Sequence, residues 1–145
     1  MNTRLAVAAH ILAFLTVNAA RPVSSETLAS SVNTNASLVR RMLVLTNKAG
    51  LTMATKGKAG GARLARNPET ITLLDVYRAV NEQPEVLRLH PHPHPLCPVG
   101  GNIAAVLQPR FDRSEATMLR ELSTTTIAEI AAEVLARNAA RAAQA

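Results

Sequence analysis

The sequence predicts a mainly α fold: a winged helix-turn-helix with a two-stranded wing, followed by a long C-terminal dimerisation helix. Alanine, the strongest helix former, is abundant, and the aromatic residues are limited to two Phe and one Tyr. The core must therefore be built from aliphatic side chains, which suits packed helices. Two short helical patterns joined by polar residues precede a glycine-rich hairpin pattern. An apolar repeat at helical spacing then extends over residues 99–122.

A buried helix that Asn2 or Thr3 can cap is predicted to run to about Asn18. Arg21-Pro22 ends this predicted helix, because the residue before a proline avoids helical backbone. Ser24 or Ser25 can then cap a short second helix that ends near Val32-Asn33. The predicted buried face of the first helix contains Leu5, Ala8, Ala9, Leu12, Leu15 and Thr16.

A third helix is expected from a cap at Thr34 or Asn35 to a glycine stop at Gly50. Its predicted inward stripe contains Leu38, Met42, Leu45 and Ala49, broadened by Val39 and Leu43. The opposite face presents Ser37, Arg40, Arg41, Val44 and Lys48. The major groove of DNA admits such a helix, and Arg can bond guanine edges or phosphates. This pattern therefore predicts a recognition helix.

The next segment reads as the wing. Residues 50–55 turn into a strand, with Leu51 and Met53 expected on one face. The tip over residues 56–61 contains three glycines, which permit positive φ, and two lysines that can reach a DNA backbone. Residues 62–66 return as the second strand, with Leu64 expected to point inward.

Three further segments complete the chain. A fourth helix is expected from Leu73 to about residue 82, capped by Thr70 or Thr72. A long helix over residues 99–122 should be kinked or broken near Pro109, which lacks an N–H. A last helix, capped by Ser123 or Thr124, should cover about residues 127–137. The predicted organisation is a winged-helix domain over 1–82, a His/Pro-rich loop over 83–98, and a dimerisation helix plus a C-terminal helix that packs back on the N-terminal domain over 99–145.

The charge is unevenly distributed. Residues 1–66 hold nine Arg or Lys and one acid, Glu26, a formal charge of +8. Residues 67–145 hold seven Arg and nine acids, a formal charge of −2. A basic N-terminal half is expected of a polyanion-binding module, although a solvated basic surface is the simpler alternative.

Several other classes of protein find little support. No Ser/His/Asp order stands out, the run Gly57-Lys58-Ala59-Gly60-Gly61 lacks the ending of a Walker loop, and we predict that the chain is not an enzyme. No apolar run is long enough to span a bilayer, so we expect a cytoplasmic protein. The single cysteine, Cys97, excludes an intramolecular disulfide.

The order of motifs resembles the Rrf2 family of bacterial winged-helix transcription regulators. The resemblance rests on Val39-Arg40-Arg41, on Leu45-x-x-x-Ala49-Gly50-Leu51, on the Gly57-x-x-Gly60-Gly61 hairpin and on Cys97-Pro98-Val99-Gly100. It implies a homodimer that binds double-stranded DNA through the third helix and the wing, with the long helix as the dimer interface. Many members hold an iron–sulfur cluster with three cysteines before the long helix. Only Cys97 is present here, so the chain is similar to the branch without that motif and we predict no cofactor.

The loop before the long helix carries His90, His92, His94 and Cys97, whose side chains are good metal ligands. Alternation with proline favours extended backbone, which spreads successive imidazoles instead of converging them. A solvated His-rich loop is the simpler interpretation, and a metal or haem sensor remains the alternative. Cys97 precedes the start of the long helix, where a helix N-terminus lowers a thiol pKa, so it is a candidate redox or thiol-reactive sensor.

We thus predict a sequence-specific transcription regulator, acting as a repressor and a homodimer, with an unknown effector. The alternatives are the metal or haem sensor and a protein-interaction module on the same scaffold. The candidate DNA-binding residues are Arg4, Ser24, Ser25, Thr27, Asn35, Ser37, Arg40, Arg41, Lys56, Lys58, Gly60 and Gly61. The candidate dimer interface contains Ile103, Leu107, Phe111, Met118 and Leu122.

Overall fold

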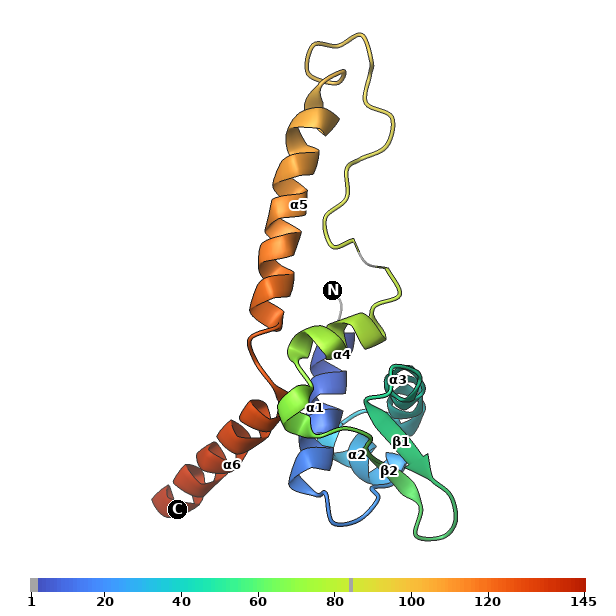
Figure 1. Ribbon diagram of the computed structural model, residues 1–145, viewed down its shortest axis with the longest axis vertical. Helices are drawn as coiled ribbons and strands as arrows, with labels where there is room; N and C mark the ends of the chain where they lie inside the picture. The colour runs from blue at the N-terminus through green and yellow to red at the C-terminus, as the bar shows by residue number, and fades with distance from the viewer. Residues whose placement is uncertain (1–2, 84) are drawn as a thin grey trace.

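A computed structural model describes residues 3–83 and 85–145, so the predicted cap at Asn2 lies outside the described residues. A helical body carries the wing, and a long helix with its loop projects from it (Figure 1). The elements in order are α1 (Arg4–Val17), α2 (Ser25–Val32), α3 (Ala36–Lys48), β1 (Thr52–Thr55), β2 (Gly61–Leu64), the 3-10 helix η1 (Pro68–Thr70), α4 (Leu73–Val80), α5 (Ile103–Leu122) and α6 (Ile127–Gln144).

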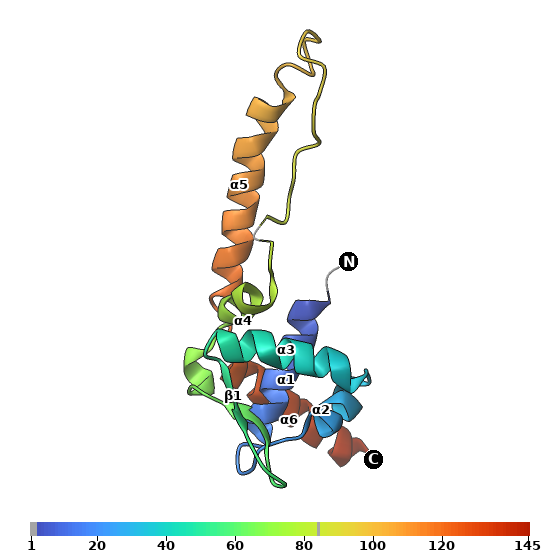
Figure 2. The ribbon, with the colours of Figure 1, turned by 90° about the vertical axis from the view of Figure 1, so that its right-hand side faces the viewer.

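Helix α1 lies at the centre of the body, in contact with α2, α3, α4, α6 and β2 (Figures 1 and 2). Ala8, Leu12 and Leu15 are buried, as the apolar spacing predicted. Ile11 and Ala13 are buried as well, whereas the prediction left them out. A helix surrounded by other elements buries more than one face. The prediction of a single buried face therefore missed these two residues.

Helix α3 begins and ends near the predicted residues, but its buried stripe is rotated. Val39, Met42 and Thr46 are buried, and Ala49 is exposed, which corrects the predicted inward position of Ala49. The hydroxyl of Thr46 lies 2.6 Å from the hydroxyl of Thr52, so a polar side chain is satisfied inside the core. A pattern of apolar residues alone could not locate this stripe, because one of its three members is a threonine.

Strands β1 and β2 form an antiparallel pair in which Thr52 lies opposite Leu64 and Thr55 lies opposite Gly61. The prediction for Met53 was wrong: Leu51 is buried just before the strand, while Met53 is 48% exposed on it. Thr52 and Ala62 are the buried residues of the two strands. The chain turns between Leu51 and the strand, so alternation counted from Leu51 assigned the wrong face.

Helix α5 begins at Ile103, four residues later than predicted, and passes Pro109 without interruption (Figures 1 and 2). Glycine is a poor helix former, and Gly100 and Gly101 lie in turns before the helix starts. The predicted break at Pro109 is absent. Ala105, whose carbonyl loses its helical partner there, and Pro109 are both exposed, so water can bond that carbonyl.

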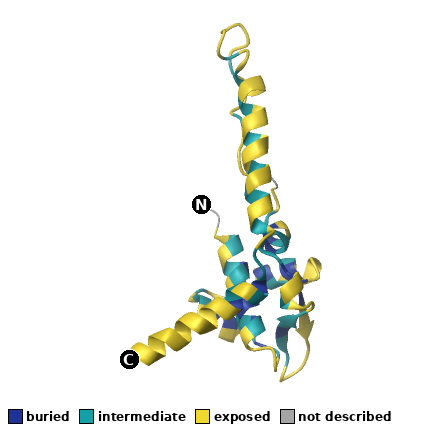
Figure 3. Ribbon diagram, turned by 60° about the vertical axis from the view of Figure 1, so that its left-hand side comes forward, coloured by how far each residue is buried: buried dark blue, intermediate teal, exposed yellow. Residues whose placement is uncertain are grey.

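Helix α6 starts from Thr126, not from the predicted caps Ser123 or Thr124. Thr126 and Glu129 form a reciprocal capping box, with the Thr126 N–H donating to the Glu129 carboxylate at 2.7 Å. The helix buries Ile127 and Ala131 against the body and continues past the predicted end to Gln144. Its outer half is exposed throughout (Figure 3).

Candidate nucleic-acid interface

The link between α2 and α3 fixes how α3 is presented. Asn33 adopts left-handed backbone with φ of 58°, and its N–H closes the end of α2 on the carbonyls of Ala29 and Ser30. Asn35 caps α3, because its side-chain oxygen accepts from the Leu38 N–H at 2.8 Å. The predicted DNA-binding side chain of Asn35 is therefore already used for the helix start.

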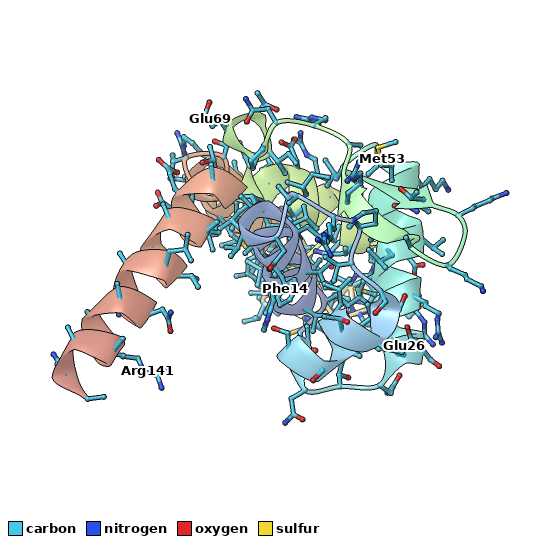
Figure 4. All side chains as sticks on the ribbon, turned by 90° about the horizontal axis from the view of Figure 1, so that it is seen from below. Phe14, Glu26, Met53, Glu69 and Arg141 are labelled. Carbon is cyan, nitrogen blue, oxygen red and sulfur yellow. The ribbon has the colours of Figure 1, made fainter. Side chains whose placement is uncertain are left out.

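The outward face of α3 is polar apart from one apolar side chain, Val44. Ser37, Arg41, Val44 and Lys48 repeat at intervals of three and four residues and are all exposed, with Arg40 beside them. This exposed face of α3 and the wing lie on the same side of the body (Figures 1 and 4). The structure therefore gathers these predicted residues on one surface.

An ion pair connects the two helices of the motif. Arg40 donates to the Glu26 carboxylate of α2, and both side chains are more than half exposed. An exposed pair contributes little to stability. It does hold the guanidinium close to α2, and this leaves Arg41 as the arginine on the outer stripe. Because a guanidinium has five N–H donors, Arg40 retains donors for a second partner.

The wing is attached to the body by its second strand. Ala62 and Val23 exchange two backbone hydrogen bonds of 2.7 and 2.9 Å. A side chain at Gly61 would collide with the Val23 carbonyl, so glycine is required there. The Gly60 N–H already donates to the Gly57 carbonyl at 3.0 Å, so a DNA contact by Gly60 would use other atoms.

The wing tip and the start of α2 enclose a cleft of about 630 Å³. Lys58 and Gly60 line it from the wing, and Ser24 and Thr27 line it from α2. The Ser24 hydroxyl accepts from the Thr27 N–H at 3.1 Å and so caps this helix terminus, with Ser25 half-buried beside it. Residues predicted separately, for the helix start and for the wing, thus come together.

Arg21 also lines this cleft, although the sequence analysis did not predict it to bind DNA. The sequence signal that could have predicted Arg21 is its position immediately before Pro22 and the cap of α2. Together Arg21 and Lys58 place two cations beside a helix N-terminus, where backbone N–H groups favour an anion. The chemistry of this cleft, which we call the wing cleft, suits a phosphate group of a nucleic-acid backbone.

Arg4 is the predicted DNA-binding residue that the structure does not bring to this surface. Its guanidinium lies 3.4 Å from the Glu82 carboxylate and donates to the Val80 carbonyl at 3.5 Å. Arg4 and the wing cleft are at opposite ends of α1, and a helix of 14 residues is about 20 Å long.

Cys97 is exposed at the far end of the projecting arm. Hydrogen bonds from the backbone N–H groups of Gly100 and Val99 lower the pKa of the Cys97 thiol below its ordinary value. The neighbouring loop folds on itself, and His94 Nδ1 accepts from the Leu96 N–H at 3.2 Å. Within residues 3–83 and 85–145, no three His, Cys, Asp or Glu side chains are grouped so that they could hold a metal ion. His90 and His92, two of the predicted metal-ligand candidates, therefore belong to no such group.

The predicted dimer-interface residues lie along one stripe of α5. Ile103, Leu107, Phe111, Met118 and Leu122 are all half-buried in the single chain. Glu115, on the same side of the helix, accepts two backbone N–H groups, from Val86 and Leu87, each at 2.7 Å. None of the residues of α5, all of which the structure describes, is fully buried.

The helices in the described part of the chain include none that is long and apolar enough to cross a membrane.

The sequence pattern of the Rrf2 family, described as iron-dependent transcriptional regulators, matches residues 1–133. The chain belongs to the Rrf2 family. A curated relative, YwnA of Bacillus subtilis strain 168, is named as an HTH-type transcriptional regulator. It is 41% identical over 130 residues, which cover 90% of this chain and 96% of YwnA. Rrf2 proteins are transcription regulators that bind DNA and are not enzymes, as the sequence predicted.

Solved structures share the Rrf2 winged-helix fold. A crystal structure reported as a DNA-binding protein is 38% identical, with a TM-score of 0.69 over 88% of this chain and 97% of that one. IscR of T. potens has a TM-score of 0.71 at 18% identity, over 92% of this chain and 87% of that one. CymR, the global cysteine regulator of B. subtilis, has a TM-score of 0.71 at 19% identity, over 92% and 96%. The predicted fold class is confirmed.

The residues of this chain do not fit an iron–sulfur cluster held by three cysteines. The sequence contains one cysteine, and its exposed thiol has no second thiolate to share a cluster with.

Proposed function

We propose that this Rrf2 protein is a cytoplasmic homodimer that represses transcription by binding a specific duplex through α3 and the wing. The observation that carries the proposal is the wing cleft, which is lined by the start of α2 and by the wing, and the wing lies on the same side of the body as the exposed face of α3. The cleft supplies Arg21, Lys58 and the capped start of α2 for a phosphate, and α3 supplies Arg41 for a base edge. The candidate positioning contacts thus come from the wing and α2, and the candidate reading contact comes from α3.

The form of α5 supports the homodimer. A helix of 20 residues is about 30 Å long, and here it leaves the body without burying one residue fully (Figure 3). The apolar stripe is only partly covered by its own chain, which contacts this side of α5 at Glu115, and a second copy of the same helix is the simplest cover for the rest. A two-fold dimer would present two recognition helices to successive major grooves, whose centres are about 34 Å apart.

A regulatory role for Cys97 belongs to the same proposal. The thiol is exposed and its pKa is lowered by the backbone N–H groups of Gly100 and Val99, so at a given pH a larger fraction of it is thiolate than in an ordinary cysteine. Alkylation at this end of the arm would alter the segment that leads into α5.

The test begins with duplexes enriched from a randomised pool by the purified protein, followed by gel shift with wild type and Arg41→Ala. Losing a bidentate contact to guanine should weaken binding of the enriched duplex by about 5-fold to 150-fold. Arg137→Ala, which removes a cation paired with Glu133 on α6, is the matched control and should bind as wild type does. No enrichment, or equal affinity of Arg41→Ala and wild type, would contradict the proposal.

A further inference from the structure

Val44 has no role in the core of the protein. Its side chain is 64% exposed, in the middle of α3. The other large apolar residues of α3, a helix that the structure describes completely, are buried or half-buried: Leu38, Val39, Met42, Leu43 and Leu45. Valine is also a weaker helix former than the Arg and Lys around it, because its branched side chain is restricted in a helix. Folding alone therefore gives no reason for valine at this position.

The neighbours of Val44 locate it on the DNA-facing surface. Arg41 precedes it by one turn and Lys48 follows it by one turn, and both are exposed. One polar stripe that would meet base edges and phosphates thus contains a single rigid apolar side chain at its centre. Val44 has neither a donor nor an acceptor, so it cannot hydrogen-bond a base.

We propose that Val44 is a specificity-determining residue that contacts the C5-methyl group of a thymine in the major groove. This inference rests on the proposed function and adds a base preference to it. Thymine is the base whose major-groove edge carries a methyl group, and apolar contact with that methyl is an established way of reading it. Against the amino group of cytosine, the valine would remove water without replacing its hydrogen bond.

Helix geometry also places the thymine relative to the base read by Arg41. Three residues of helix rise about 4.5 Å, and successive base pairs are about 3.4 Å apart. The thymine is therefore expected within one or two base pairs of the guanine that Arg41 contacts. Each half-site of the operator should therefore contain this guanine and this thymine at that spacing, on the same strand or on opposite strands.

The experiment replaces each dT of the enriched duplex by dU, one position at a time, which removes only the methyl group. Affinities are measured for wild type, Val44→Ala and the control Val134→Ala, which makes the same truncation at a half-exposed position on α6. Circular dichroism of each variant checks that it is folded. One dU position per half-site should weaken wild type and Val134→Ala about fourfold, the effect of one buried methyl-sized group. The same substitution should leave Val44→Ala unchanged.

Two results would overturn the inference while leaving the proposed function intact. One is a wild-type protein that binds every dU duplex as well as the parent duplex. The other is a penalty at the sensitive position that is the same in Val44→Ala as in wild type. Failure to enrich any duplex would instead remove the proposed function, and the inference with it.

Discussion

The salt dependence of DNA binding gives a sharp test of the wing cleft. Lys58→Ala removes one cation per chain from this cleft, in which Lys58 and Arg21 lie beside the capped start of α2. Each phosphate contact contributes about 0.9 to the slope of log affinity against log salt, so a homodimer that loses two contacts should lose about 1.8. Because Lys58 is exposed at the wing tip, the substitution should not affect folding.

This change in slope translates into a large difference between two salt concentrations. When the salt concentration rises fourfold, from 50 to 200 mM, the affinity of wild type should fall by a factor about twelvefold larger than the factor for Lys58→Ala. Fluorescence anisotropy with the enriched duplex at five or six salt concentrations gives both slopes. Arg141→Ala removes the same charge from α6, which lies on the side of the body away from α3 (Figure 4), and should keep the wild-type slope. A Lys58→Ala slope equal to wild type would refute the phosphate assignment, and a change of about 0.9 would refute the dimer.

Three further predictions concern stability and reactivity. Gly61→Ala should separate the wing from Val23 and cost about 1–3 kcal/mol, the net value of two hydrogen bonds, which differential scanning calorimetry would detect as a lower Tm than wild type. Pro109→Ala should restore the bond to the Ala105 carbonyl and stabilise α5 by up to about 3 kcal/mol; an unchanged urea midpoint would contradict this. Iodoacetamide should react with Cys97 at a rate that rises with pH and reaches half its maximum at a lower pH than a free cysteine peptide, because only the thiolate reacts; an unshifted profile would contradict the lowered pKa.

Local signals in the sequence were sufficient for most of the elements. Asn35 and Thr72 are caps in the structure, and the glycines at 57, 60 and 61 form the hairpin that their number indicated. These features depend on residues within a few positions of one another. A short window of sequence therefore contains the physical cause, whether it is a side chain that caps an N–H or a backbone that needs positive φ.

Features that depend on distant residues were missed. Arg21 and Lys58 share the wing cleft because Val23 bonds Ala62, and no local pattern records that pairing. Arg4 was predicted to bind DNA because it is basic and near the start of the first helix, whereas in the structure it pairs with Glu82, two residues beyond α4. Charge indicates which half of the chain is expected to bind a polyanion, but tertiary contacts decide which cations reach the surface.

The hydrogen bonds made by Glu115 divide the connection between α4 and α5 into two parts. By holding the N–H groups of Val86 and Leu87, one carboxylate fixes the loop to the side of the helix close to the body. The chain between Leu87 and the start of α5 at Ile103 forms a lobe, and both ends of this lobe lie at α5 (Figure 1). Cys97 lies in this lobe, so the two hydrogen bonds to Glu115 stand between it and α4 along the chain.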